Sequence, residues 1–320
     1  MPEPSPESGG RDFATALAED EHAHSLTPSS GGLVAGGVFS GPETERIRRK
    51  GIGIGGWLCI AWLILILFMA FFGSKIPGIP DPVNDVGTPR LGWGASGHPF
   101  GTDGQGRDVL SLIVNGTYNS MYIGVVSVFF GLVVGGFLGI VAGYFKGAIG
   151  GVLGGLTDIL LAYPQLVLAL SIVTFLGNSV FWVTVALAIV SVPVLARISR
   201  ASTLSWSERE FVVAARAQGA KHGRVMLREI FPNVLPAMLS IALLGVAVVI
   251  VAEAGLAIIG AGVNPEKITW GNTIQSGISD LTDAPNIVLA PSFVIFITVM
   301  ALNFLGDVLR AKFDVRESAL

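Results

Sequence analysis

The stretch from Ile52 to Phe72, which reads IGIGGWLCIAWLILILFMAFF, decides the class of fold. It holds 21 residues without a charged side chain. As an α-helix that rises 1.5 Å per residue it would be about 31 Å long, which matches the hydrocarbon thickness of a bilayer. The stretch therefore predicts a transmembrane helix rather than a helix on the surface of a soluble domain.

Similar apolar stretches recur along the rest of the chain. Hydrophobic residues make up 51% of the 320 residues and charged residues only 13%, whereas soluble domains hold about 25% charged residues. The predicted spans cover residues 52–72, 120–144, 152–176, 181–196, 234–259 and 287–305. The sequence thus predicts an all-α membrane protein with six transmembrane helices.

Lysine and arginine are distributed unevenly between the two sides that six spans create. If the N-terminus lies inside, the cytoplasmic parts are residues 1–51, 145–151, 197–233 and 306–320, and they carry 16 of the 20 Lys and Arg residues. Membrane proteins keep positive charge on the cytoplasmic side. The distribution predicts a multi-pass protein of the plasma or inner cell membrane with both termini in the cytoplasm.

Changes in composition divide the chain into four parts. Residues 1–50 are rich in Pro, Ser, Gly and Glu and have no sustained apolar period, so they predict a disordered cytoplasmic tail. Residues 51–114 hold the first span and an extracytoplasmic loop. The core is expected over 115–310, with a cytoplasmic loop over 197–233, and residues 311–320 are expected to form a cytoplasmic C-terminal tail.

Motifs for catalysis, cofactors and metals do not occur in the sequence. Residues 51–56 match the dinucleotide fingerprint by letter, but no strand precedes them and a membrane span follows. No P-loop of the form G-x-x-x-x-G-K-[ST] is present, so the chain itself is not expected to bind ATP. The histidines, His22, His24, His98 and His222, have no partners at the spacing of zinc ligands. We expect a protein that is not an enzyme and has no cofactor, metal or nucleic-acid partner.

The cytoplasmic loop before the fifth span holds the most informative motif. From Glu208 it reads EREFVVAARAQGAKHGRVMLREIFPN. Residues 211–218 predict a helix that ends near Gly219, and Pro232 and Pro236 are expected to break any helix before the fifth span.

Two interpretations of this loop follow from the residues alone. Ala215 and Gly219 lie four residues apart, so they would share one helix face and form a flat strip that another protein could approach closely. Basic residues surround this strip: Arg216, Lys221, Arg224 and Arg228. A basic amphipathic segment also binds anionic lipid surfaces, which is the second interpretation.

The same loop resembles the cytoplasmic EAA loop of permease subunits in ATP-binding-cassette importers. Val213 replaces the glutamate of that motif, as is common in the branch that imports peptides and nickel. The branch pattern of an acidic residue, an aromatic, Val and then AARA-x-GA is present from Glu210 to Ala220. The resemblance implies that the loop couples the permease to its ATPase subunits through Glu210, Ala214, Ala215, Arg216, Gly219, Ala220, Arg228 and Pro232.

The resemblance extends over roughly residues 50–316. Residues 98–111, HPFGTDGQGRDVLS, are similar to the outside segment before the second span in the C-type subunit of dipeptide and oligopeptide importers. Further motifs follow in the family's order and spacing: 142–144, Asp158 with 162–164, 253–256, 270–271 and 302–310. Ile268 and Thr269 replace the proline and serine that are usual before Trp270, and the tail of 50 residues has no counterpart.

The resemblance implies a fold, a function and a set of partners. The fold would be the five-helix core of a type I importer permease, preceded by one N-terminal helix. The function would be the translocation pore of a dipeptide or oligopeptide importer, which couples ATP hydrolysis by its partners to alternating access. The implied partners are a second, B-type permease, two ATPase subunits, an extracytoplasmic substrate-binding protein, the peptide and membrane lipid. Glutathione and nickel-chelate importers share these motifs, so the cargo stays open.

Three acids lie inside or beside the predicted spans and support an alternative function: Asp158, Glu253 and Asp307. Asp158 and Glu253 are intramembrane candidates, and burying such charges is costly unless they serve a function or find partners. An ion-coupled secondary transporter would use them as a relay, although no inverted repeat is evident. The other interpretation is that both acids are structural or face the pore.

Overall fold

The computed structural model describes residues 53–77, 79–82 and 85–317, and these are mostly helical. The helices are α2 (Ile54–Phe72), α3 (Val109–Tyr144), α4 (Ala148–Ala162), α5 (Gln165–Leu176), α6 (Val180–Ser207), α7 (Glu210–Ala217), α8 (His222–Arg224), α9 (Phe231–Ile258), α10 (Trp270–Gly277) and α11 (Asn286–Glu317), with a π-helix, η2 (Val225–Ile230), and two 3₁₀ turns, η1 (Gly73–Lys75) and η3 (Ile278–Asp280). The tail expected over residues 1–50 lies outside the described residues.

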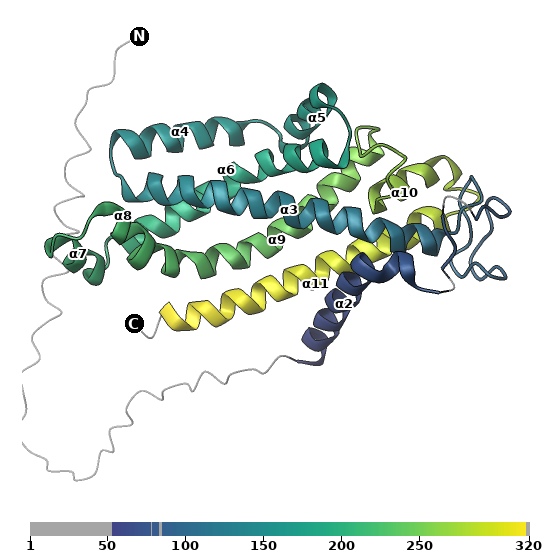
Figure 1. Ribbon diagram of the computed structural model, residues 1–320, viewed down its shortest axis with the longest axis horizontal. Helices are drawn as coiled ribbons and strands as arrows, with labels where there is room; N and C mark the ends of the chain where they lie inside the picture. The colour runs from purple at the N-terminus through teal and green to yellow at the C-terminus, as the bar shows by residue number, and fades with distance from the viewer. Residues whose placement is uncertain (1–52, 78, 83–84, 318–320) are drawn as a thin grey trace, which may run out of the picture. The chain divides into compact units, whose positions relative to one another are not determined.

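The predicted membrane character of the helices is confirmed. Five of the described helical segments are long and apolar enough to cross a membrane, and the pair α4 and α5 makes a sixth candidate if the two count as one span. The long helices run side by side, and the C-terminal end of α3 lies at the same end of the bundle as α7 and the last turns of α11 (Figure 1). The described basic segments, residues 145–151, 197–233 and 306–317, therefore lie together at one end.

Helices α3 and α6 pack closely along most of their length (Figure 1). The face of α3 that meets α6 carries a glycine at every fourth residue: Gly131, Gly135, Gly139 and Gly143. A Cβ atom at Gly135 would lie 2.5 Å from the carbonyl oxygen of Val192, and one at Gly139 would overlap the carbonyl oxygen of Ala196. Small residues at this spacing allow membrane helices to approach closely, so this glycine face fixes the α3–α6 pair.

Gly139→Leu is expected to lower the stability of the protein by about 3 kcal/mol or more, because the new side chain would force α6 away from α3. The matched control is Gly151→Leu on α4, where a Cβ meets no atom within 4 Å. Thermal unfolding in detergent, with the yield of monodisperse protein, measures both. Equal stability of the two variants would show that the close approach of α3 and α6 is not needed.

The core of the bundle lies where α3, α6, α9, α10 and α11 meet. Its largest fully buried side chains include Trp270, Leu112, Ile123, Leu187, Ile250, Leu256 and Ile287. The indole N–H of Trp270 donates to the carbonyl oxygen of Ile113 at 3.0 Å, so α10 is fixed to the first turns of α3. The loop before the last span thus contains a helix, α10, that the sequence analysis did not predict.

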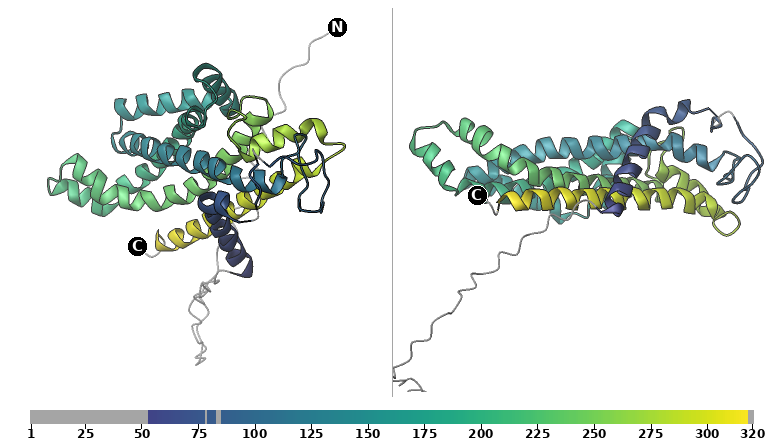
Figure 2. Two further views of the ribbon diagram at one scale, coloured as in Figure 1. Left: turned by 45° about the vertical axis from the view of Figure 1, so that its right-hand side comes forward. Right: turned by 90° about the horizontal axis from the view of Figure 1, so that it is seen from below.

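Helix α2 lies on the outside of the bundle, as expected of an extra N-terminal helix. It crosses α11 obliquely, as both views in Figure 2 show. The indole N–H of Trp62 donates to the hydroxyl of Thr298 on α11 at 3.0 Å. Most of its other side chains are exposed, among them Trp57 and Phe71. An all-apolar helix with this exposure is suited to contact with lipid or with another membrane subunit.

The predicted third span, residues 152–176, is not one continuous helix. Helices α4 and α5 are bent by 86° at the break. Pro164 has no backbone N–H and disfavours a helical conformation at the residue before it. Tyr163 is accordingly extended, with φ −83° and ψ 138°. The proline therefore breaks the span, and the prediction of a single helix here is wrong.

The helices on either side of α7 extend further than predicted. Helix α6 continues through residues 197–207, which were expected to belong to the loop, because its last turns pack on the glycine face of α3. Helical structure also runs from His222 to Ile258, so the expected break at Pro232 and Pro236 is wrong. The π-helix η2 ends at Ile230, and Pro232 lies in the first turn of α9, a position where an α-helix tolerates a proline.

Candidate functional site

Helix α7, the short helix between α6 and α9, begins and ends one residue earlier than the predicted range of 211–218. Glu210 lies in its first turn and Arg216 in its last, where each charge stabilises the helix dipole. Gly219 follows with a φ of +81°, a conformation that glycine adopts without steric cost. The N–H of Ala220 then donates to the carbonyl oxygen of Ala215 at 3.0 Å. This backbone turn closes α7 and directs the chain into α8.

The inner face of α7 is attached to the ends of α3 and α6. Val212 is fully buried in a cluster that includes Tyr144 at the end of α3 and Trp206 at the end of α6. The guanidinium of Arg216 lies 4.7 Å from the centre of the Tyr144 ring. The Tyr144 hydroxyl and Nδ1 of His222 form a hydrogen bond of 2.9 Å. Tyr144 therefore contacts both α7 and α8 and joins them to a membrane helix.

The outer face of α7 is exposed and carries small side chains beside two larger apolar ones, Phe211 and Val213. Ala214, Ala217 and Gln218 are exposed, as is Gly219, whereas Ala215 is half-buried. The flat surface is thus centred on Ala214 and Ala217 rather than on the predicted pair Ala215 and Gly219. A Cβ at Gly219 would meet no atom within 4 Å, so the space beyond this face is open.

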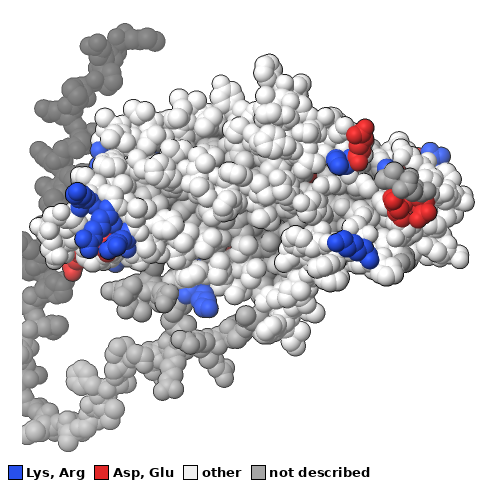
Figure 3. Space-filling model, viewed as in Figure 1, with Lys and Arg blue, Asp and Glu red and all other residues white. Residues whose placement is uncertain are grey.

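The remaining residues of the predicted coupling loop lie around α7. Ala220 is half-buried against the Tyr144 cluster, Arg228 is exposed on η2, and Pro232 lies in the first turn of α9. Lys146, just after α3, forms an ion pair of 2.8 Å with Glu208, and its ammonium lowers the pKa of that carboxyl. Figure 3 shows Lys and Arg side chains gathered at the end of the molecule formed by α7 and α8.

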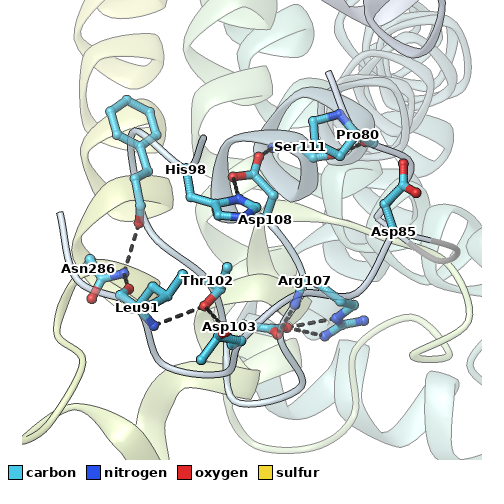
Figure 4. Close-up of polar contacts among 12 residues, drawn as sticks. Pro80, Asp85, Leu91, His98, Thr102, Asp103, Arg107, Asp108, Ser111 and Asn286 are labelled. Atoms are coloured by element: carbon cyan, nitrogen blue, oxygen red, sulfur yellow. Dashed lines mark hydrogen bonds and ion pairs between the residues drawn. The ribbon is translucent and has the colours of Figure 1, made fainter. Parts of the chain in front are cut away.

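At the other end of the bundle a polar network orders the loop before α3 (Figure 4). Asp108 caps α3 by accepting the N–H of Ser111 at 2.7 Å, and its other oxygen lies 2.9 Å from Nδ1 of His98. Asp103 accepts from the side chain and the backbone N–H of Arg107. These residues belong to the motif at 98–111, whose polar positions therefore hold the loop in shape.

The same loop is fixed to η3 and to the start of α11. The side-chain amide of Asn286 donates to the carbonyl oxygens of Leu91 and Phe100, at 3.1 and 2.8 Å (Figure 4). Arg90 forms an ion pair of 2.8 Å with Asp280, whose carboxylate raises the pKa of the guanidinium. The loop and the segment around α10 thus form one ordered surface at this end.

The two acidic candidates lie in different surroundings. Asp158 is exposed on α4. Glu253 on α9 is 1% exposed, its carboxylate oxygens make no hydrogen bond of normal geometry, and the side chain of Thr269 is the polar group that faces it. Gly271 at the start of α10 packs on the backbone of Ala254 beside it. The acids do not form a common site, and no group of three or more His, Cys, Asp or Glu suited to a metal occurs among the described residues.

Comparison with known proteins agrees with this arrangement. The family model for the inner membrane component of binding-protein-dependent transport systems matches residues 135–318. The dipeptide transport system permease protein DppC of Alkalihalophilus pseudofirmus is 35% identical over 271 residues, which cover 84% of this chain and 88% of that protein. The glutathione transport system permease protein GsiD of Pectobacterium atrosepticum is 33% identical over 271 residues, 84% of this chain and 89% of that protein.

Solved structures of an ATP-binding-cassette transporter have the same fold. A chain from an inward-facing structure of the MetNI methionine ABC transporter matches with a TM-score of 0.55 and 20% identity, over 63% of this chain and 96% of that one. This likeness shows the fold, and the extent of the sequence matches shows the family that the EAA-like loop suggested. The chain belongs to the binding-protein-dependent transport system inner membrane component family, and it is a multi-pass permease subunit that forms the translocation pore of an ATP-binding-cassette importer.

Proposed function

We propose that this chain is the C-type permease of a peptide importer and that α7 is its contact with an ATPase subunit. The observation that carries the coupling role is the outer face of α7, where exposed small side chains stand on a helix whose inner face is fixed to α3 and α6. The relatives that transport a dipeptide and glutathione support a short peptide as cargo. Residues 115–310 would form the transport core, with the coupling loop at 197–233.

Coupling in this proposal depends on the rigidity of the attachment of α7. When a partner bound at Ala214 and Ala217 moves, α7 moves with it. The contacts of Arg216 and His222 with Tyr144 then transmit that movement to the end of α3. Because α3 packs on α6 through its glycine face, the two helices would move together. ATP binding and hydrolysis remain in the partner, since this chain has no P-loop. The chain itself would catalyse no reaction.

The partners are tested by purifying the intact complex through a tag on this chain. We expect two ATP-binding-cassette ATPase subunits and a second permease to copurify, and an extracytoplasmic binding protein to join when peptide is added. ATP hydrolysis should require the ATPase subunits, and this chain alone should show none above background. Purification as a stable assembly without any ATPase subunit would contradict the proposal.

The proposed orientation is tested by labelling single cysteines on intact cells. In a Cys59→Ser background, Ser96→Cys in the loop before α3 should react with a membrane-impermeant thiol reagent, and Gln218→Cys at the end of α7 should not. Both positions are exposed in the structure, so access rather than burial decides the result. Gln218→Cys should react once the cells are opened. Labelling of Gln218→Cys from outside would reverse the orientation and exclude contact between α7 and a cytoplasmic ATPase.

A further inference from the structure

A groove of about 450 Å³ opens on the surface between α3 and the segment that leads into α9. Its walls include Phe129, Val133 and Phe137 from α3 and Leu227, Phe231 and Leu235 from η2 and α9. Phe137 is 67% exposed and Leu227 is 69% exposed, so the groove is open to its surroundings rather than enclosed. The two helices that form it are membrane-spanning, and the groove lies in their half nearest α7.

The segment that leads into α9 also carries three exposed basic residues next to the groove lining in sequence, which we call the rim: Lys221, Arg224 and Arg228. All three are exposed, and no ion pair or hydrogen bond of their side chains with another described residue is present. Arg224 directly follows Gly223, and Arg228 directly follows Leu227, and both of these neighbours line the groove.

The net charge around the rim is positive, although residues 221–230 also contain one acidic residue. Glu229 is half-buried, and His222 is engaged with Tyr144. The three cations of the rim therefore outnumber the nearby carboxylate. Long basic side chains at the end of a membrane helix extend toward lipid headgroups, and clusters of them attract anionic lipids.

We propose that the groove and its rim bind one anionic phospholipid, with an acyl chain against the groove wall and the phosphate between Arg224 and Arg228. The apolar wall of the groove lies next to the basic rim, and in a phospholipid the acyl chains likewise lie next to the charged headgroup. A soluble partner that used the rim alone would leave Leu227 and Phe137 uncovered. The lipid site is separate from the outer face of α7, so both surfaces can be occupied together.

The test compares lipid retention by variants of the complete complex. The complex is reconstituted in nanodiscs that hold equal amounts of phosphatidylglycerol and phosphatidylcholine with the same acyl chains, released, and examined by native mass spectrometry. Wild type is expected to retain phosphatidylglycerol. Arg224→Gln/Arg228→Gln should lower this retention about tenfold or more, since each basic residue near a membrane surface contributes to anionic lipid binding. The control is Arg310→Gln/Lys312→Gln, which removes two exposed charges from α11 and should retain the lipid.

A second variant separates a lipid from a simple anion. A Cβ at Gly223 meets no atom within 4 Å, so Gly223→Phe can fill the mouth of the groove while the rim stays intact. We expect Gly223→Phe to lose phosphatidylglycerol as strongly as the rim variant. An excess of inorganic phosphate should not displace the lipid from wild type.

Three results would overturn the lipid site. Wild type could retain the two lipids equally. Gly223→Phe could retain phosphatidylglycerol while phosphate displaces it from wild type, which would indicate an anion site without an acyl chain. The rim variant could instead release an ATPase or permease subunit with lipid retention unchanged, which would indicate that the rim contacts protein. Lipid retention is measured without transport, so failure of this proposal leaves the proposed peptide import untouched.

Discussion

Ala214→Leu is expected to lower ATP-dependent peptide uptake about tenfold or more, a loss that corresponds to 1.4 kcal/mol or more of coupling energy. Ala214 is exposed on the outer face of α7. A bulky side chain there would hold the ATPase subunit away from the helix. Leucine is a good helix former, so α7 itself should stay intact. Uptake and ATPase activity in reconstituted vesicles, at matched protein level, measure the effect.

The matched control for this variant is Ala311→Leu. Ala311 is also exposed and lies on α11 at the same end of the bundle, away from α7. It should leave uptake unchanged. If α7 instead lies on the lipid surface, Ala214→Leu should be neutral or should strengthen membrane contact, because added apolar area favours the interface. Normal uptake by Ala214→Leu would therefore favour the lipid-surface interpretation over contact with an ATPase.

Tyr144→Ala is expected to uncouple ATP hydrolysis from transport. Its ring is buried and lies under the guanidinium of Arg216, and its hydroxyl bonds His222. Truncating a buried aromatic side chain costs about 3–5 kcal/mol, which would here be lost from the attachment of α7 to α3. The ATPase subunits should still bind to the outer face of α7. We expect hydrolysis to continue while peptide uptake falls about tenfold or more.

Tyr144→Phe separates attachment from general instability. It keeps the ring and its contact with Arg216 and removes only the hydrogen bond to His222, which contributes about 1 kcal/mol. This variant should keep most of the uptake. If Tyr144→Ala retained a normal ratio of peptide moved to ATP hydrolysed, Tyr144 would not carry movement between α7 and α3. If Tyr144→Ala failed to accumulate, the ratio measured for Tyr144→Phe combined with Arg216→Gln would decide the same question.

The parts of the fold that depend on local signals could be predicted from the sequence. The first span follows from an uninterrupted apolar run, and the end of α7 follows from Gly219, whose positive φ the structure confirms. The grouping of basic segments at one end follows from the distribution of Lys and Arg along the chain. The family resemblance rested on the EAA-like loop and on a series of further motifs between residues 98 and 310, and it is confirmed by the sequence matches.

The predicted helix boundaries were wrong where tertiary contacts or the backbone conformation near a proline override the apolar pattern. Pro164 lies inside the predicted third span, but hydropathy does not show whether a membrane proline bends a helix or breaks it, and here it breaks the span. The prediction for Pro232 was wrong in the opposite direction, because this proline lies in the first turn of α9 and the helical structure continues through it. Helix α6 continues to Ser207 because its last turns pack on α3, a contact that charge counting along the chain does not reveal.

The site residues were predicted as a set, but their orientation was not. Counting four residues back from Gly219 placed Ala215 on the predicted contact face. In the structure Val212 is buried, and α7 is therefore oriented so that Ala214 and Ala217 face outward. Tyr144 was noted only within a family motif. Its partners Arg216 and His222 lie more than 70 residues away in the chain, so the contact depends on the fold. Glu253 was a candidate, but its burial against α10 could not be predicted because α10 itself was missed.

ATP-dependent peptide uptake by the complete complex in sealed vesicles tests the central claim most directly. The complex, purified through a tag on this chain with its partners, is reconstituted with the binding protein and a labelled dipeptide or tripeptide on the outer side of the transporter and ATP on the side of α7. Uptake is expected to require ATP, to stop with a non-hydrolysable analogue and to be insensitive to an imposed proton or sodium gradient. Uptake driven by an ion gradient without ATP would contradict the account and favour an ion-coupled transporter.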